Sequence, residues 1–298
     1  MLSAYTGHLA ALGAAALWAF TALFIEGAAR RVGSLTVNLL RLVFAFVFLS
    51  LVGLLSRGQP LPLDATPHNW LWLAVSGLAG FTFGDLCLYR AYVVIGPRLS
   101  SLMMALVPPI TALTGWLLLG ETLTPRDLLG MTLTVVGIGW AILDRGRGSE
   151  SGPIAVSPAG VALGFGGALG QAVGLILSKI GMAGYDPFAA TQVRVIAGTV
   201  GYSLLFFALR WWPNVRTGLR DRKAVGLSWL GAFFGPFLGV SLSLIAVRDT
   251  VSGVAASIMA LTPVLIIPLV ILFRKERVGI GGLIGALIAV TGVALLFL

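Results

Sequence analysis

Hydrophobic residues fill ten stretches of this chain, and short polar connections separate them. The stretches cover residues 8–29, 36–55, 70–94, 97–119, 126–143, 159–180, 187–209, 224–247, 251–273 and 278–298. Their lengths are close to the about 20 residues that a helix needs to cross the hydrocarbon core of a bilayer. The alternating pattern of a membrane β-barrel is missing, and a helix satisfies its own backbone polar groups in lipid. The pattern predicts an all-α integral membrane protein with ten transmembrane helices.

The second half of the chain repeats the first half. The segment Met104–Pro108 (MALVP) returns 155 residues later as Met259–Pro263 (MALTP). Nearer the N-terminus, an offset of 153 residues places Arg41 opposite Arg194. The larger offset also aligns a glutamate and two glycines of each copy, namely Glu121 with Glu276, Gly130 with Gly285 and Gly137 with Gly292. Such internal similarity indicates a duplicated structural unit.

Each copy contains five predicted helices, in residues 1–143 and 159–298, and residues 144–158 form the linker between them. An odd number of crossings forces the second copy into the bilayer upside down. Inverted repeats are typical of secondary transporters, in which the substrate site lies at the repeat interface near the bilayer midplane. The sequence therefore predicts two inverted five-helix repeats around one central site.

Composition places nearly the whole chain in the membrane. Hydrophobic residues make up 58% of the 298 residues and charged residues only 10%, so lipid must cover much of the apolar surface. The one cysteine, Cys87, excludes an internal disulfide and a multi-cysteine metal site, and we expect no metal and no cofactor. The first apolar stretch lacks a basic start and a cleavage pattern, so we expect a mature helix there rather than a signal peptide.

The net charge of +9 is better explained by membrane topology than by nucleic-acid binding, because basic residues hold loops in the cytoplasm. Fourteen Lys and Arg residues lie on one predicted side of the membrane, four on the other and two within helices. The fourteen are Arg30, Arg31, Arg90, Arg98, Arg145, Arg147, Arg210, Arg216, Arg220, Arg222, Lys223, Arg274, Lys275 and Arg277, and the four are Arg57, Arg126, Lys179 and Arg248. We therefore expect a multi-pass protein of the cytoplasmic (inner) cell membrane with both termini extracytoplasmic.

Several short motifs follow one another in the same order in the two copies. The first copy carries Ala16-Leu17-Trp18, Leu40-Arg41, Leu88-Tyr89-Arg90-Ala91, Ser100-Ser101-Leu102, Pro108, Gly120-Glu121, Gly130 and Gly137, and the second carries Pro263, Glu276, Gly285 and Gly292. In this order the chain resembles the EamA-type ten-helix permeases of the drug/metabolite transporter superfamily. The resemblance implies a transporter, often an exporter of amino acids or other small metabolites. Members commonly have cytoplasmic termini and a basic loop between helices 2 and 3, whereas this loop contains only Arg57.

Ionisable side chains inside the predicted helices are candidates for function, because each costs roughly 2.5–3.5 kcal/mol to insert. Arg41 and Arg194 approach the membrane centre from opposite sides. Each could bind substrate, form an internal ion pair or extend its charged end to the membrane interface. Asp85 is the deepest acid, and Tyr89 lies one turn further on the same face. If Asp85 pairs with Arg41, we expect it to stay charged and mainly structural. If it faces the cavity unpaired, it could accept a proton during transport or hold a substrate amine.

The second copy has no carboxylate opposite Arg194, because Val240 stands at the position that matches Asp85. Asp186, Asp249 or the substrate are then the candidate partners of Arg194. Charged residues at the helix ends are expected to have structural roles. Glu26 and Lys179 should anchor their helices at the membrane interface, and Glu121 and Glu276 are acids placed favourably near helix starts.

Pro108 and Pro263 fall near the middle of their predicted helices. A proline removes one backbone hydrogen bond, so the carbonyls four residues back, at Met104 and Met259, should lose their partners. Broken helices line the central site of many transporters, although a proline can also produce a simple packing kink. Trp18 and Gln171 are mid-helix repeat counterparts, suited to stack on a substrate and to hydrogen-bond it. The predicted substrate-binding residues are Trp18, Arg41, Asp85, Tyr89, Pro108, Gln171, Arg194 and Pro263.

These features predict a secondary transporter that moves a small organic metabolite, an amino acid or similar, by alternating access, with export favoured by the resemblance. A flippase for a lipid-linked intermediate is one alternative, and a lateral opening between helices would favour it. An intramembrane hydrolase is the other, but Asp85 has no second mid-membrane aspartate to complete a dyad, and we do not expect an enzyme. The expected partners are a small-molecule substrate and membrane lipid, without nucleic acid; proton or ion coupling and the oligomeric state stay open.

Overall fold

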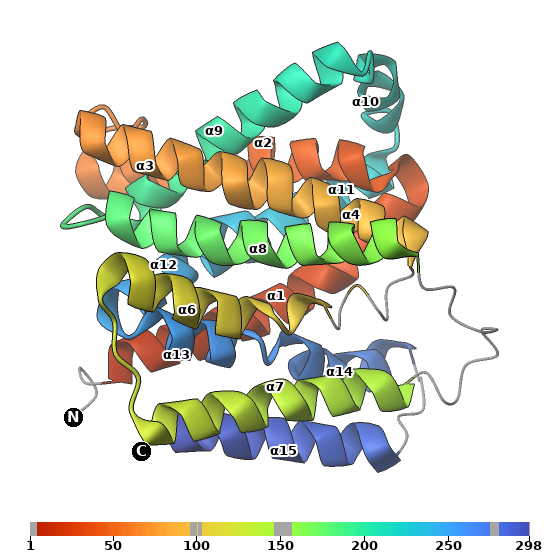
Figure 1. The fold of residues 1–298 in the computed structure, drawn as a ribbon. Coiled ribbons are helices and arrows are strands. Elements are labelled where there is room, and N and C mark those ends of the chain that lie inside the picture. Colours follow the sequence, from red (N-terminus) through yellow and green to blue (C-terminus); the bar gives the residue numbers. More distant parts are fainter. Residues whose placement is uncertain (1–4, 96–99, 101–102, 146–156, 275–279, 298) are drawn as a thin grey trace.

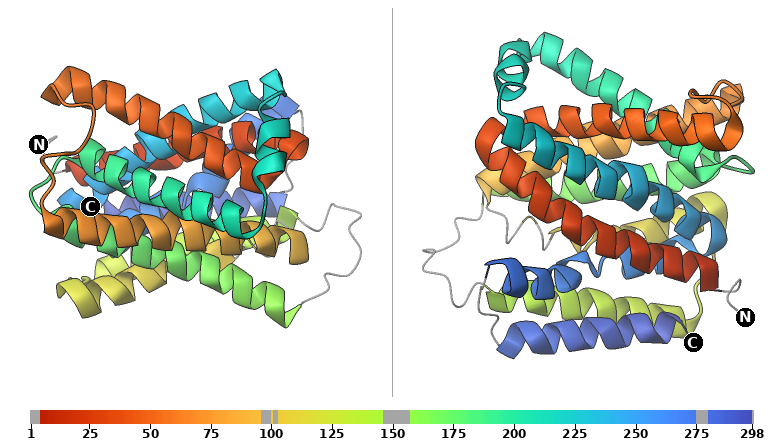
Figure 2. Two further views of the ribbon diagram at one scale, coloured as in Figure 1. Left: turned by 90° about the horizontal axis from the view of Figure 1, so that it is seen from above. Right: turned by 180° about the vertical axis from the view of Figure 1, so that it is seen from behind.

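The computed structural model of the chain describes residues 5–95, 100, 103–145, 157–274 and 280–297. All regular structure in these residues is helical, as predicted. The long helices lie side by side in a bundle, and the start of α1 (Thr6–Val32) and the end of α15 (Ile280–Leu296) lie at the same end of it (Figures 1 and 2). Most of the predicted linker at 144–158 lies outside the described residues.

Each predicted apolar stretch contains helix where the structure describes it. The first copy contributes α1, α2 (Ser34–Arg57), α3 (Pro67–Gly77), the π-helical segment η2 (Leu78–Gly84), α4 (Asp85–Val94), α6 (Val107–Leu119) and α7 (Pro125–Arg145). The second contributes α8 (Pro158–Gly181), α9 (Pro187–Ala208), α10 (Trp212–Gly218), α11 (Arg222–Ala232), η3 (Phe233–Gly239), α12 (Val240–Asp249), α13 (Ser252–Met259), α14 (Thr262–Arg274) and α15. The π-helical segments η2 and η3 occupy matching positions, 155 residues apart, in the middle of two long spans.

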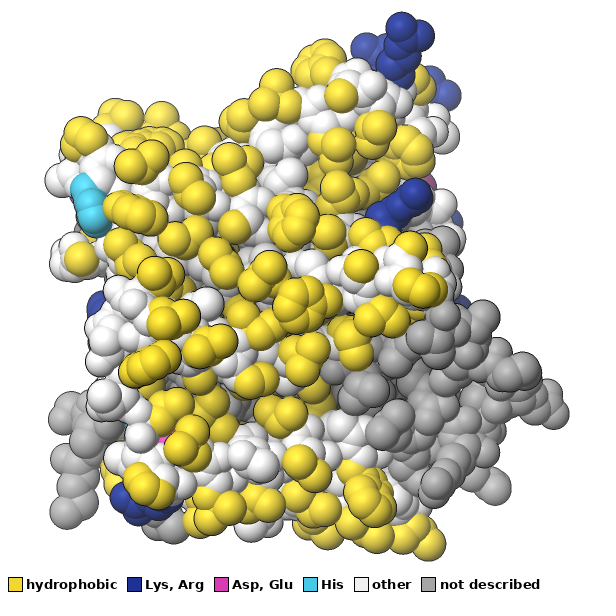
Figure 3. Space-filling model, in the orientation of Figure 1, with side chains coloured by type: hydrophobic (Ala, Val, Ile, Leu, Met, Phe, Trp, Pro, Cys, Tyr) yellow, Lys and Arg dark blue, Asp and Glu magenta, His cyan; other side chains and the backbone are white. Residues whose placement is uncertain are grey.

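Six helices in the described residues are long and apolar enough to cross a membrane: α1, α2, α8, α9, the span from α3 into α4 and the span from α11 to α12. Shorter apolar helices follow at 107–119, 252–266 and 280–296. Large hydrophobic side chains on the outer faces remain exposed, including Phe207 and Leu287, and Figure 3 shows hydrophobic atoms across most of one face. The outer faces of the helices are thus apolar enough to contact lipid, while the count of ten crossings stays a prediction.

Helix starts follow the local signals in the sequence. The Asp186 carboxylate accepts a hydrogen bond from the Ala189 amide at 2.9 Å, and Pro187 begins α9 behind it. Thr124 and Asp127 cap each other in the same manner before Pro125 begins α7. A capping side chain accepts a hydrogen bond from a backbone amide that has no partner within the helix. A proline at the first helical position has no amide hydrogen to satisfy. The pairs Thr124-Pro125 and Asp186-Pro187 thus mark the starts of α7 and α9.

The last helices of the two copies, α7 and α15, pack side by side along their whole length (Figures 1 and 2). Their contact pairs the repeated glycines crosswise, because Gly130 meets Gly292 and Gly137 meets Gly285. A Cβ atom at Gly137 would lie only 2.4 Å from the Ala289 nitrogen, so glycine is needed for this approach. The crosswise pairing makes α7 and α15 antiparallel, as inverted copies require.

Two further glycine seams bring other helices together, as the four-residue spacing of glycines indicates. Gly170 of α8 faces Gly84, at the end of η2, backbone to backbone. At the matching place in the second copy, Gly239 faces the Trp18 indole of α1. The first helix of each copy therefore packs against the π-helical span of the other copy, and the two copies interlock around the centre of the bundle.

Candidate functional site

A cavity of about 380 Å³ lies between the two copies. Seven of the eight predicted site residues line it: Trp18, Arg41, Asp85, Tyr89, Gln171, Arg194 and Pro263. Pro108 does not line it; this proline is buried next to Val107, which does. The structure thus brings nearly all of the predicted residues together, and their role in binding substrate stays a prediction.

The lining of the cavity repeats the internal symmetry of the sequence. Nine pairs of lining residues are separated by the repeat offsets of 153 or 155 positions, namely Trp18 and Gln171, Ala22 and Leu175, Arg41 and Arg194, Phe81 and Pro236, Asp85 and Val240, Leu88 and Ser243, Met104 and Met259, Ala105 and Ala260, and Val107 and Thr262. Equivalent elements of both copies therefore face the same space. This is the arrangement expected of a site on a pseudo-two-fold axis.

The carboxylate of Asp85 is held between two helices of different copies. Arg41 of α2 forms a salt bridge with Oδ2 of Asp85, and both side chains are almost fully buried. Gln171 of α8 donates from Nε2 to Oδ1 of the same carboxylate at 2.8 Å and to the Gly80 carbonyl at 3.3 Å. Both oxygens of Asp85 therefore have partners, and the structure meets the condition under which we expect this acid to be charged and mainly structural.

Arg194 of α9 is equally buried but is not paired in the same way. It is only 5% exposed, and no carboxylate among the described residues forms a salt bridge with it. The two acids nearest in sequence are engaged elsewhere, because Asp186 caps α9 and Asp249 pairs with Arg248 at 2.6 Å. Pairing of Arg194 with either acid is therefore wrong. Its guanidinium carbon lies 5.1 Å from the centre of the Phe81 ring.

The helices that carry Pro108 and Pro263 are interrupted beside the cavity. The regular helical hydrogen-bond pattern is interrupted at residues 105 and 106, directly before α6, and at residues 260 and 261, between α13 and α14. A proline ring cannot follow a regular preceding turn, because it clashes with the carbonyl four residues back. The predicted breaks are confirmed. In the second copy the Thr262 hydroxyl donates to the Met259 carbonyl at 2.9 Å, so that freed carbonyl has found a side-chain partner.

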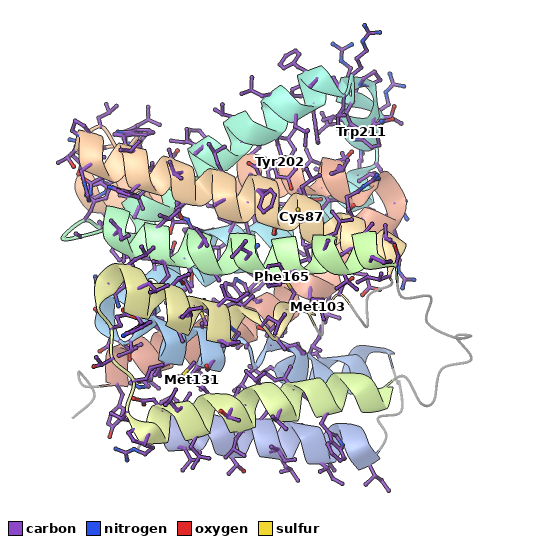
Figure 4. The ribbon with its side chains drawn as sticks, viewed as in Figure 1. Cys87, Met103, Met131, Phe165, Tyr202 and Trp211 are labelled. Carbon is purple, nitrogen blue, oxygen red and sulfur yellow. The ribbon has the colours of Figure 1, made fainter. Side chains whose placement is uncertain are left out.

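Sequence reasoning missed several lining residues. Thr21, Phe81 and Ser243 line the cavity with no charge or proline to mark them. Thr262 also lines it, and a signal existed, because this hydroxyl residue directly precedes the marked Pro263. Cys87, on α4, packs against Gly166 of α8 and is absent from the lining (Figure 4).

One end of the bundle is tied together across the two copies. Lys179 near the end of α8 donates to Oε1 of Glu121 at 2.6 Å and to the Thr250 carbonyl at 2.9 Å. Glu121 also accepts from the amide and the hydroxyl of Ser252, each at 2.9 Å, where α13 starts. We expected Lys179 to anchor its helix at the membrane interface, whereas in the structure it forms an ion pair between the two copies. Glu26 forms the exposed pair with Arg30, and Glu276 lies outside the described residues.

The neighbouring loops join the copies at the same end. The Tyr185 hydroxyl, between α8 and α9, donates to Oδ1 of Asp64 at 2.8 Å, and Arg57 at the end of α2 forms a salt bridge with the same carboxylate at 3.0 Å. Partial burial and the hydrogen bond to Asp64 raise the pKa of Tyr185 to about 12. The phenol therefore stays a donor at physiological pH.

Comparison with known families agrees with this architecture. The sequence profile of the EamA-like transporter family matches residues 5–143 and 158–298. The chain belongs to the EamA-like transporter family. With its several apolar helices, this EamA protein is a multi-pass membrane protein of the drug/metabolite transporter superfamily, which is a group of transporters and not of enzymes.

Individual relatives match the EamA chain in part or in fold. The threonine/homoserine exporters RhtA of Escherichia coli strain K12 and of Escherichia coli O157:H7 are each 32% identical over 131 residues. That match covers 42% of this chain and 41% of the exporter, so it spans about two fifths of the length of these relatives. One solved crystal structure has a TM-score of 0.76 and 17% identity, over 97% of this chain and 95% of the other chain. At that identity it shows the fold alone.

Proposed function

We propose that this EamA protein is a secondary transporter that moves a small organic metabolite, an amino acid or a similar solute, across the inner membrane by alternating access. The central cavity carries the proposal, because matching residues of both copies line it. In an alternating-access mechanism the two copies rock around a fixed site, and a site on the axis between them can open to either side. Export is the favoured direction, by analogy with the exporters that part of the chain matches.

The architecture proposed is ten transmembrane helices in two inverted five-helix repeats, residues 1–143 and 159–298. The crosswise contact of Gly130 with Gly292 and of Gly137 with Gly285 supports the inversion. The breaks beside the cavity support a transport role, because a broken helix offers backbone polar groups and a hinge at the bilayer midplane. The excess of Lys and Arg on one predicted side supports extracytoplasmic termini.

The size and lining of the cavity favour a small amphipathic solute. Its volume of about 380 Å³ is at the lower end of the range for ligand pockets. Aromatic side chains of Trp18, Phe81 and Tyr89 supply apolar contact, while Gln171, Ser243 and Thr262 supply polar groups. Asp85 is the sole carboxylate among the lining residues that the structure describes, which disfavours a hydrolase with an acid dyad. Proton or ion coupling is open in this proposal.

Efflux from liposomes tests the proposal. Purified protein is reconstituted into liposomes loaded with a mixture of amino acids, amines and nucleosides, and the solutes released are identified by mass spectrometry. We expect saturable release of a small set of related solutes that protein-free liposomes retain. Release of none of them, together with scrambling of a labelled lipid-linked sugar between leaflets, would favour the flippase instead.

A further inference from the structure

The cavity is lined by two repeat-related arginines, but only one of the two copies supplies a carboxylate. Arg41 and Arg194 are repeat counterparts and both line the cavity, but the counterpart of Asp85 is Val240. The charged groups among the described lining residues are therefore two cations and one anion. Together these three side chains carry a net charge of +1 in the centre of an apolar bundle, where an uncompensated charge is unfavourable.

The surplus charge resides on Arg194. Arg41 takes one oxygen of Asp85 and Gln171 takes the other, so this carboxylate is saturated by partners that hold it in place. The Nε atom of Arg194 is buried and has no hydrogen-bond partner among the described residues. Its contact with the Phe81 ring is a cation–π interaction, which is weaker than an ion pair and leaves the donors of the guanidinium edge available.

We propose that Arg194 is the anchor for a carboxylate group of the transported solute. This inference rests on the proposed transport function. A planar guanidinium matches a carboxylate with two parallel hydrogen bonds, so the carboxylate of a solute supplies the salt-bridge partner that Arg194 does not have among the described residues. A phosphate monoester carries about −1.5 to −2 charges at pH 7, which is more than the single charge of this guanidinium compensates.

The same geometry excludes other classes of solute. An amine without an acid group offers Arg194 no anion, and the one carboxylate among the described lining residues is already occupied. A solute without any charged group would likewise leave Arg194 without an anion. The site therefore selects for solutes that carry a carboxylate, and the aromatic lining receives their apolar portion.

Paired solutes and matched variants test this role. Liposomes are loaded with L-amino acids together with their amino alcohols, such as L-threonine with L-threoninol, which differ only in the carboxylate. The variants are Arg194→Gln, Arg194→Lys and, as a control, Arg216→Gln at an exposed position of α10. We expect the parent and the control to release amino acids and retain the alcohols. Arg194→Gln should lose roughly 200- to 5,000-fold in kcat/KM, the loss for breaking a buried ion pair, and Arg194→Lys should recover part of it.

Release of amino alcohols at the same rate, or unchanged kcat/KM in Arg194→Gln, would overturn the anchor and leave the transport function standing. Absence of any release by the parent would overturn the transport function itself. Thermal unfolding without solute then decides on the anchor independently. Arg194 forms no salt bridge among the described residues, so Arg194→Gln should lower the melting temperature much less than Arg41→Gln, which breaks the salt bridge with Asp85. A fall as large as that of Arg41→Gln would show a structural arginine and contradict the proposal.

Discussion

The ammonium group of Lys179 lies 2.6 Å from Oε1 of Glu121, and this ion pair joins the second copy of the chain to the first. Glu121 also holds the start of α13 through Ser252. The pair has no equivalent by sequence at the other end of the bundle, because the repeat counterparts of Lys179 and Glu121 are the acids Glu26 and Glu276. Two acids at these matching positions cannot form the same ion pair with each other.

Replacing Lys179 by methionine should destabilise the fold. The substitution leaves the mostly buried Glu121 without its cation, which costs about 1–3 kcal/mol for an unsatisfied charged group. The measurement is the thermal unfolding of the purified protein in detergent. The double variant Lys179→Met/Glu121→Gln should recover part of the loss. Arg30→Met is the control, because the exposed pair of Arg30 with Glu26 should contribute less than about 1 kcal/mol. Equal losses for both lysine and arginine variants would contradict this reading.

Asp85→Asn should lower stability strongly. The change leaves Arg41 and Arg194 together in the cavity without an anion, and loss of one partner of a buried pair costs roughly 3–5 kcal/mol. The double variant Arg41→Gln/Asp85→Asn should regain most of that stability. Because both oxygens of Asp85 are occupied, the dependence of transport on pH should keep its shape in Asp85→Asn. A flattened pH profile in this variant, measured by uptake into liposomes, would instead assign proton coupling to Asp85.

Gly137→Ala should weaken the contact between α7 and α15. The added methyl would lie 2.4 Å from the Ala289 nitrogen, and overpacking of this kind costs about 1–3 kcal/mol. Gly226→Ala in α11 is the matched control, because no atom lies within 4 Å of a Cβ added there. That control should be neutral or more stable by up to about 1 kcal/mol. The melting temperature should therefore fall by several degrees in Gly137→Ala and stay the same or rise in Gly226→Ala. Equal changes in the two variants would contradict the packing described.

Sequence periodicity located the helices well, because apolar length and capping residues act locally. The repeat offset also predicted the cavity, since a duplicated chain must place Trp18 with Gln171 and Arg41 with Arg194 about one axis. Charge partners were harder to predict. Asp85 could be assigned to Arg41, because both fall in one membrane half. The partner of Lys179 could not be assigned, because its contact with Glu121 depends on how α8 packs against α6, which ends just before Glu121. Lining residues such as Thr21 and Ser243 carry no signal at all, because only packing decides which face of a helix meets the cavity.

Both termini should be extracytoplasmic. Basic residues accumulate on the side opposite the termini, and such loops stay in the cytoplasm. A fluorescent protein that folds only in the cytoplasm, fused after Leu298, should therefore stay dark, whereas the same reporter inserted after Arg220, between α10 and α11, should fluoresce. A bright C-terminal fusion would show that this member has the orientation common in its family.

The central claim is that solute crosses the membrane through the cavity between the two copies. Ala260 lines that cavity at the break between α13 and α14, and Cys87 can be removed to leave one new thiol. The decisive measurement is solute efflux from liposomes by Cys87→Ser/Ala260→Cys before and after reaction with a bulky uncharged maleimide. The control is Cys87→Ser/Leu204→Cys, whose thiol replaces an exposed side chain on the outer face of α9. We predict that labelling stops efflux at position 260 and spares it at position 204. Unchanged efflux after complete labelling of position 260 would contradict a central pathway.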